Sequence, residues 1–249
     1  MAILELKGIG KSFGALEVLA EVDLDIEEGK ITSVIGPNGA GKTTLFNVIS
    51  GRFPVSTGTI LFKKRDITRL RPHEITLAGL GRSFQITNIF QKLTVAENVF
   101  LAVQTRSPKR MSLFTRFQEL GDVHQRTTEI LERIGLRKWA DIPAGQLSHG
   151  DQRHLEIGMT LATGPELLLL DEPTSGMSPA EAGETMDLIK DLSRDFTIVL
   201  IEHNMDIVMN ISDRIAVLNF GRKIAEGSPE EVADNPEVRR VYLGERFSL

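Results

Sequence analysis

The residue pattern best suited to chemistry lies at residues 36–44, where three glycines precede a lysine and two threonines. The residues of this loop are Gly36, Pro37, Asn38, Gly39, Ala40, Gly41, Lys42, Thr43 and Thr44. They fit the phosphate-loop pattern G-x-x-x-x-G-K-[ST] without adjustment. In such a loop the backbone N–H groups surround a polyphosphate, Lys42 reaches its β- and γ-phosphates, and the Thr43 hydroxyl is placed to ligate Mg²⁺. The alternative is a glycine-rich turn without a ligand.

The residues on either side of this loop predict the strand and the helix that a phosphate site requires. Residues 31–35 are mostly β-branched and are typical of a buried strand, whereas residues 44–49 have helical character. A helix that begins at the loop adds the positive end of its dipole to the anion site.

Two carboxylates and a histidine follow two continuous apolar runs of strand length. Asp171 and Glu172 come directly after leucines 167–170, and His203 comes shortly after residues 197–201. Continuous apolar runs of this length are typical of central parallel strands, whose carboxyl ends meet at the edge where ligands bind. We expect Asp171 to hold Mg²⁺ through water, Glu172 to activate a water that attacks the γ-phosphate, and His203 to lie beside them. Alternatively, these charges only cap strands that leave the core.

Composition limits the class of protein. The chain has 249 residues, 41% of them hydrophobic, which is enough for a sizeable core. With 29 Lys and Arg against 34 Asp and Glu, it lacks the basic excess of a nucleic-acid-binding protein, and the absence of cysteine excludes disulfides and thiolate metal sites. We find neither an apolar run near the roughly 18 residues of a membrane span nor a secretory signal at residues 1–7. We therefore expect a cytoplasmic chain that another protein anchors if it works at a membrane.

The remaining elements place the motifs in an α/β fold. Residues 1–30 alternate apolar and polar side chains, which predicts short antiparallel strands. Ser178, Pro179 and Glu181 predict a helix start between the two apolar runs, and a strand, helix and strand at this spacing form a parallel βαβ unit. Further elements are expected at residues 59–62 (strand), 72–80 (helix), 81–85 (strand), 94–98 and 127–134 (helices), 214–218 and 223–225 (hairpin), and after residues 228–231 (closing helices).

The segment Leu-Ser-His-Gly-Asp at residues 147–151 identifies the family that the chain resembles. Ser148 opens a helix, and the segment looks like the signature motif of ABC-type ATPases, Leu-Ser-Gly-Gly-Gln. His149 and Asp151 depart from that pattern, but Ser148 and Gly150 remain. The D-loop, residues 175–178, is a second departure, because it has a serine where the family commonly has aspartate. The contact that the aspartate carboxylate makes across subunits in the family is therefore in doubt for this chain.

Six motifs in the family's order support this resemblance. They are Phe13 at the adenine-stacking position, residues 36–44 as Walker A, Gln85 in the Q-loop, residues 147–151 as the signature, residues 167–172 as Walker B and His203 as the switch histidine. The resemblance implies that ATP and Mg²⁺ bind here, that Gln85 senses the metal and the attacking water, and that Ser148 and Gly150 contact the γ-phosphate bound on a partner chain. Without the resemblance, a lone Phe in a strand is more often a core residue than a stacking platform for adenine.

The resemblance also implies the architecture. We expect one ABC ATP-binding domain over residues 1–249, with a mostly parallel core sheet and an N-terminal antiparallel β subdomain formed by residues 1–85 and 147–249. Residues 86–146 are expected to be an inserted helical subdomain, and its signature helix is expected to continue to about residue 163.

Within the family, residues 81–85, 93–99, 201–205 and 241–244 look most like the ATP-binding subunits of branched-chain amino acid importers and their urea-importing relatives. This implies an ATP hydrolase that pairs with a second ATP-binding subunit, the same or a sister chain, on transmembrane permease subunits at the inner face of the membrane. A solute-binding protein is an indirect partner, and nucleic acid is not expected as one. The alternatives are a soluble ABC-type ATPase acting on nucleic acid or ribosomes, and a nucleotide-binding regulatory module.

Overall fold

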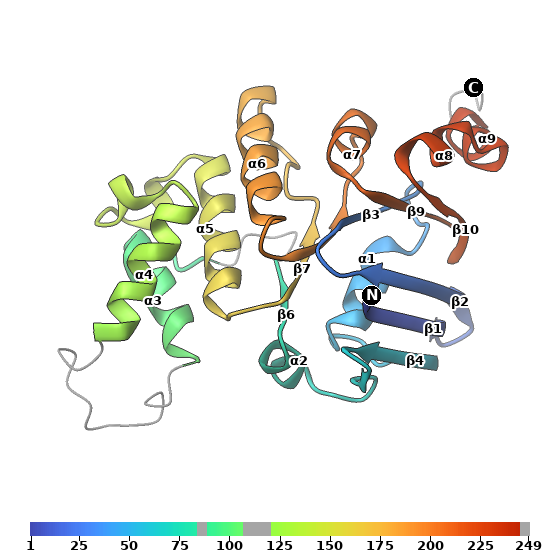
Figure 1. The fold of residues 1–249 in the computed structure, drawn as a ribbon, viewed down its shortest axis with the longest axis horizontal. Helices are drawn as coiled ribbons and strands as arrows, with labels where there is room; N and C mark the ends of the chain where they lie inside the picture. The colour runs from blue at the N-terminus through green and yellow to red at the C-terminus, as the bar shows by residue number, and fades with distance from the viewer. Residues whose placement is uncertain (84–88, 107–120, 245–249) are drawn as a thin grey trace.

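The structure is a computed structural model that describes residues 1–83, 89–106 and 121–244. In this part of the chain two sheets lie next to each other, and the helices α3, α4 and α5 gather at the end of the molecule opposite the antiparallel sheet (Figure 1). The parallel sheet lies between these two ends and therefore contacts both.

The first sheet is antiparallel and has the strand order β2-β1-β4-β5. Its strands are β1 (Ala2–Phe13), β2 (Leu16–Glu27), β4 (Thr57–Phe62) and β5 (Arg65–Asp66). The antiparallel arrangement predicted for residues 1–30 is confirmed, but β1 and β2 are not short, since each extends over 12 residues. A bulge between Leu6 and Ile9, with Gly8 at φ 57°, lets both apolar side chains stay buried although they are three residues apart.

The second sheet has the strand order β10-β9-β3-β8-β7-β6. Its strands are β3 (Ile31–Ile35), β6 (Leu80–Arg82), β7 (Leu167–Asp171), β8 (Thr197–Ile201), β9 (Arg214–Asn219) and β10 (Arg222–Gly227). The strands from β9 to β6 are parallel, and β10 pairs with β9 as the predicted antiparallel hairpin. The predicted βαβ unit is confirmed, because β7 and β8 are parallel neighbours joined by α6 (Pro179–Leu192).

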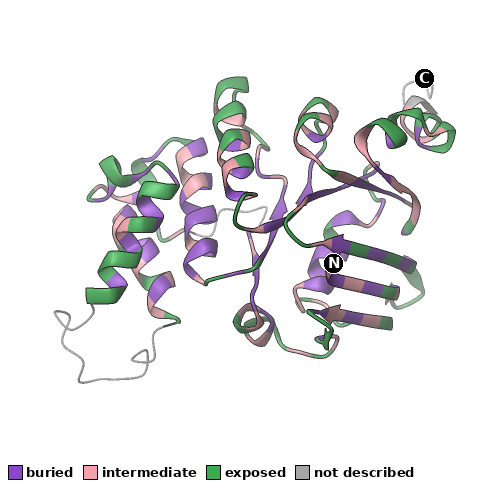
Figure 2. Cartoon of the chain, in the orientation of Figure 1, coloured by how far each residue is buried: buried purple, intermediate pink, exposed green. Residues whose placement is uncertain are grey.

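The leucines of β7 show how this sheet is buried on both faces. Leu167 and Leu169 pack in a core with α1 (Lys42–Ile49) and the antiparallel sheet, whereas Leu168 and Leu170 pack in a second core with α5 and α6. Because neighbouring side chains of a strand point to opposite faces, a strand between two cores must be apolar at every position. Figure 2 shows the central strands buried and the outer faces of α4 and α6 exposed.

The remaining helices either lie against the two sheets or, like α3 and α4, pack on α5. They are α2 (Pro72–Ala78), α3 (Val95–Gln104), α4 (Gly121–Arg133), α5 (His149–Ala162), α7 (Met205–Ile211), α8 (Pro229–Asp234) and α9 (Pro236–Gly244). The helix predicted at 72–80 ends at Ala78, because Gly79 adopts a left-handed φ of 113° and Leu80 begins β6. The helix predicted from residue 127 begins earlier, at Gly121. Within the described residues, every helix is too short or too polar to cross a lipid bilayer.

Candidate functional site

The predicted phosphate loop connects β3 to α1 and surrounds a buried lysine. The Lys42 ammonium donates hydrogen bonds to the carbonyls of Gly36 at 2.7 Å and Pro37 at 3.0 Å, so it lies inside the turn of the loop. The side chain is buried, and α1 begins at the same residue. A positive charge and a helix N-terminus therefore meet at one point, which is the electrostatic requirement of a polyphosphate site.

Two glycines allow this loop to pack tightly between β2 and β9. Gly36 has φ 151°, and a Cβ atom there would lie 2.1 Å from the carbonyl oxygen of Leu218 in β9. Gly41 has φ 101°, and its Cβ would lie 3.0 Å from the carbonyl oxygen of Val18 in β2. Any larger residue would push the loop off the strands that support it, so these two glycines serve the loop's position as well as its turn.

Glu172 and His203 lie at the carboxyl edge of the parallel sheet, after β7 and β8. Glu172 has φ 47°, a left-handed conformation that residues other than glycine rarely adopt. The Glu172 Oε1 atom lies 2.5 Å from His203 Nε2, within hydrogen-bonding distance. Both residues line a cavity of about 210 Å³ together with Val18 of β2 and residues 38–44 of the loop. The structure therefore brings the lysine loop, a carboxylate and an imidazole around one space, although they are far apart in the sequence.

Asp171 directly precedes Glu172 in the chain and is enclosed by protein. Its side chain is about 1% exposed, and its Oδ2 atom accepts a hydrogen bond of 3.1 Å from Arg82 of β6. The Oδ1 atom is buried without a hydrogen-bond partner. Burial raises the pKa of Asp171, and the Arg82 guanidinium partly opposes that shift.

The chemistry of these donors fits a magnesium ion that is shared with a nucleotide. No group of three or more His, Cys, Asp or Glu side chains suited to a metal occurs among the residues that the structure describes. Mg²⁺ in nucleotide sites takes one or two protein oxygens, and water and phosphate supply the rest. The unpaired Oδ1 of Asp171 and the exposed Thr43 next to Lys42 are oxygens of this kind.

The signature residues begin α5, away from the cavity that holds the loop. Ser148 is the N-cap of α5, and its hydroxyl accepts a hydrogen bond from the N–H of Asp151 at 3.1 Å. The Gly150 N–H donates to Glu181 of α6 at 3.4 Å, so the first turns of α5 and α6 are in contact. Ser148 and Gly150 therefore do not line the cavity of the phosphate loop in the same chain.

Phe13 and Gln85 complete the predicted set. The Phe13 ring is 43% exposed and packs edge to face against Phe53, with ring centroids 5.3 Å apart. It lies at the end of β1 and does not line the cavity of the phosphate loop. Gln85 lies outside the described residues.

Two buried groups at this edge were missed by the sequence analysis. Arg82 lies in a predicted strand, and a charged residue in a buried strand is itself a sign of a specific partner. Glu202 is buried directly before His203, and its carboxylate accepts hydrogen bonds from the Thr174 hydroxyl at 2.6 Å, the Thr174 N–H at 3.1 Å and the His203 N–H at 3.1 Å. It thus joins the segment after β7 to the segment after β8.

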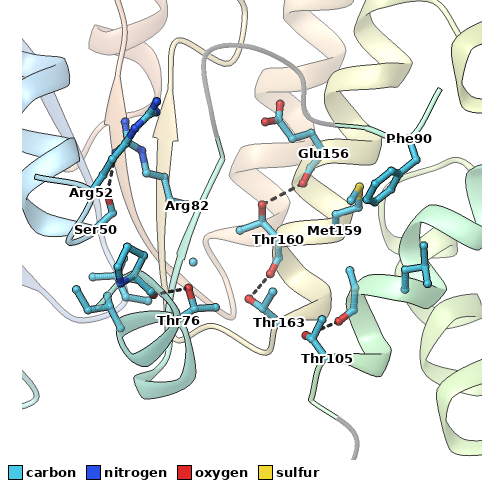
Figure 3. Close-up of a pocket in the computed structure, with 16 residues that line it drawn as sticks. Ser50, Arg52, Thr76, Arg82, Phe90, Thr105, Glu156, Met159, Thr160 and Thr163 are labelled. Atoms are coloured by element: carbon cyan, nitrogen blue, oxygen red, sulfur yellow. Dashed lines mark hydrogen bonds between the residues drawn. The ribbon is translucent and has the colours of Figure 1, made fainter. Parts of the chain in front are cut away.

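A second, larger and mainly apolar cavity of about 820 Å³ lies against β6 (Figure 3). It is lined on one side by α2, β6 and the residues after α1, and on the other by α3 and α5. Arg82 and Ser50 approach it from the first side, and Glu156, Met159 and Thr160 of α5 face them.

Comparison with known proteins identifies the family. Residues 19–175 match the family described as ABC transporter, and residues 222–248 match the one described as branched-chain amino acid ATP-binding cassette transporter. The chain is 41% identical over 252 residues to the high-affinity branched-chain amino acid transport ATP-binding protein LivG of Salmonella typhimurium, and the match covers 98% of each protein.

Solved structures agree with this assignment. An ATP-binding cassette of an ABC transporter in its ADP conformation has a TM-score of 0.87 and 33% identity, with 98% of this chain and 99% of that chain covered. A dimeric cassette in a post-hydrolysis state with ADP and Pi has a TM-score of 0.77 and 27% identity, with 91% and 98% covered. The chain therefore belongs to the ABC transporter family and is an ABC-type ATPase of its branched-chain amino acid group.

Proposed function

We propose that this chain is the ATP-hydrolysing subunit that drives the import of branched-chain amino acids through membrane permease subunits. One observation carries the proposal: the phosphate loop, Glu172 and His203 line a single cavity at the carboxyl edge of the parallel sheet. A phosphate-binding loop, a carboxylate and an imidazole are the groups that phosphoryl transfer to water requires.

Each residue of the site has a role that follows from its position. The N–H groups of residues 38–44 and the Lys42 ammonium hold the phosphates, and the exposed ring of Phe13 stacks on the adenine. Glu172 accepts the proton of the attacking water, while His203 orients Glu172 through their hydrogen bond. Thr43 and Asp171 would hold Mg²⁺, as would Gln85 by the family resemblance, and the ion would neutralise charge on the phosphates.

A second ATP-binding subunit completes the site. Ser148 and Gly150 begin a helix whose N–H groups suit an anion, but they lie outside the cavity of their own phosphate loop. In a head-to-tail pair, the helix start of one chain covers the phosphates held by the other. The dimeric cassette described above supports this arrangement.

The helical segment and the apolar cavity suit the connection to the permease. We propose the division into a core of residues 1–85 and 147–249 and a helical unit of residues 86–146. The cavity of about 820 Å³ lies where these two parts meet, and its apolar lining suits a helix of a permease subunit. ATP-driven closure of the pair would change the width of this cavity and so move the permease. The chain then works at the inner face of the membrane, held there by the permease.

Reconstitution tests this function. The chain, purified with its permease subunits, is placed in lipid vesicles, and uptake of radiolabelled leucine, isoleucine and valine is measured with and without ATP on the side of the chain. We expect ATP-dependent uptake that an excess of unlabelled leucine suppresses. ATP hydrolysis without uptake of any of these solutes, or hydrolysis stimulated by nucleic acid instead, would contradict the proposal.

A further inference from the structure

Arg82 and Asp171 form an ion pair that is almost completely enclosed by protein. Their side chains are 5% and 1% exposed, and Arg82 Nη2 lies 3.1 Å from Asp171 Oδ2. Removing two charged groups from water costs several kcal/mol per ion, so a pair of this kind stabilises a fold poorly compared with apolar residues. Because one member of the pair is the predicted metal carboxylate, the pair calls for a role other than stability.

The Arg82 guanidinium is held in one orientation from its other side. Its Nη1 atom donates to Asn47 Oδ1 at 2.9 Å and to Ser50 Oγ at 2.7 Å. Asn47 belongs to α1, the helix that begins at the phosphate loop, and Ser50 is the residue that ends it. Because the guanidinium is planar and rigid, three acceptors on two elements fix both its position and its plane.

This orientation determines which carboxylate oxygen of Asp171 accepts a hydrogen bond from Arg82. Oδ2 faces Arg82, whereas Oδ1 is the carboxylate oxygen with no hydrogen-bond partner. The main chain of the same residue is also held, since Arg153 of α5 donates to the Asp171 carbonyl at 2.5 Å and pairs with Glu156 at 2.5 Å. Asp171 therefore has its carbonyl and one carboxylate oxygen fixed.

We propose that Arg82 is a positioning residue for the metal carboxylate, because by holding Oδ2 of Asp171 it presents Oδ1 to the Mg²⁺ that accompanies ATP. This inference rests on the proposed function, which places Mg²⁺ at Asp171. Arg82 itself does not touch nucleotide or metal. Its contribution is to prevent rotation of the carboxylate and to join the end of α1 to the end of β7, so that the loop and the carboxylate keep one spacing.

A lysine at position 82 cannot replace the arginine. An ammonium group carries the charge but lacks the planar fork, so it does not reach Asn47, Ser50 and Asp171 in one fixed arrangement. Arg82→Gln keeps an amide donor and removes the charge. Both variants therefore loosen Asp171, and partners of metal ligands typically contribute about 10–100-fold to metal affinity.

The test separates metal binding from nucleotide binding in the purified full-length chain. The non-hydrolysable analogue AMP-PNP is bound in EDTA to measure its affinity without metal. Mn²⁺ is then titrated into the chain held in excess over AMP-PNP and well above its dissociation constant, so that little analogue is free. Bound metal is followed by the loss of the free Mn²⁺ signal in electron paramagnetic resonance, with AMP-PNP alone as the reference. We expect both Arg82→Lys and Arg82→Gln to need at least about tenfold more Mn²⁺ for half-saturation, with AMP-PNP affinity in EDTA unchanged.

A destabilised control distinguishes positioning from general loss of structure. Ile189 is buried in α6 and has no polar side-chain atom, so Ile189→Ala lowers stability without removing a hydrogen bond to Asp171. We expect its Mn²⁺ titration to match the wild type. Arg82 variants with unchanged Mn²⁺ half-saturation, or an Ile189→Ala shift as large as theirs, would overturn the inference. Failure of the wild type to bind Mn²⁺ with AMP-PNP would instead contradict the proposed function.

Discussion

Replacing Glu172 with glutamine is the most direct test of the chemistry at the sheet edge. Glutamine has nearly the same shape and keeps a group within hydrogen-bonding distance of His203, 2.5 Å away in the wild type. The substitution therefore removes the proton acceptor and leaves the geometry of the cavity in place. It also removes a negative charge close to the phosphates, so we expect ATP to bind as tightly as before or more tightly.

The expected size of the effect follows from the role of a general base. Such a base typically contributes about 10²- to 10⁴-fold to the rate, which corresponds to about 3–5 kcal/mol on the activation barrier. We therefore expect phosphate release at saturating ATP to fall by that factor. Glu172 is the carboxylate that lines this cavity, and its side chain is only 13% exposed, so bulk water is a poor substitute for it.

The assay measures phosphate release and ATP affinity on the same preparation. Glu184→Gln is the matched control, because it makes the same chemical change at an exposed position of α6 that does not line the cavity. Its turnover should equal that of the wild type. Turnover of Glu172→Gln within about tenfold of the wild type, with ATP affinity retained, would refute the assignment of Glu172 as the base.

Three further predictions concern pairing, pH and helix capping. Ser148→Arg and Lys42→Ala chains, each inactive alone, should regain ATPase activity when mixed if like chains pair, because one site of the mixed pair is intact; no recovery would contradict a shared site. Burial lowers the pKa of His154, whose Nε2 lies 3.0 Å from the Thr185 hydroxyl. The neutral form of His154 therefore contributes to the free energy of unfolding above the unfolded pKa of about 6.5, and this contribution is lost as pH falls through the lower folded pKa. In urea unfolding, the free energy of unfolding of His154→Gln should fall less from pH 7 to pH 5 than that of the wild type. Ser178→Ala removes the N-cap of α6 and should cost about 1 kcal/mol in the same assay, whereas an unchanged midpoint would exclude a stabilising cap.

Several elements were predictable because their signals are local. The phosphate loop, its strand and its helix follow one another within 20 residues of sequence, and the N-cap of α6 is set by Ser178, Pro179 and Glu181. The continuous leucines of β7 predicted a strand covered on both faces, since only a strand between two cores is apolar at every position. The predicted lengths of β1 and β2 were wrong, because a bulge changes which residues face the core and interrupts the alternation of apolar and polar residues on which the prediction relied.

The loop chemistry, the order of the elements and the residues at the strand ends could be predicted from the chain alone, because each depends on neighbours along it. Which buried polar groups meet depends on the fold. Arg82 and Asp171 are 89 residues apart, and Thr174 and Glu202 are 28 apart, yet each pair shares a hydrogen bond in the buried edge of the sheet. The physical reason is that β6, β7 and β8 are neighbours in space, and a buried charge takes its partner from the adjacent strand.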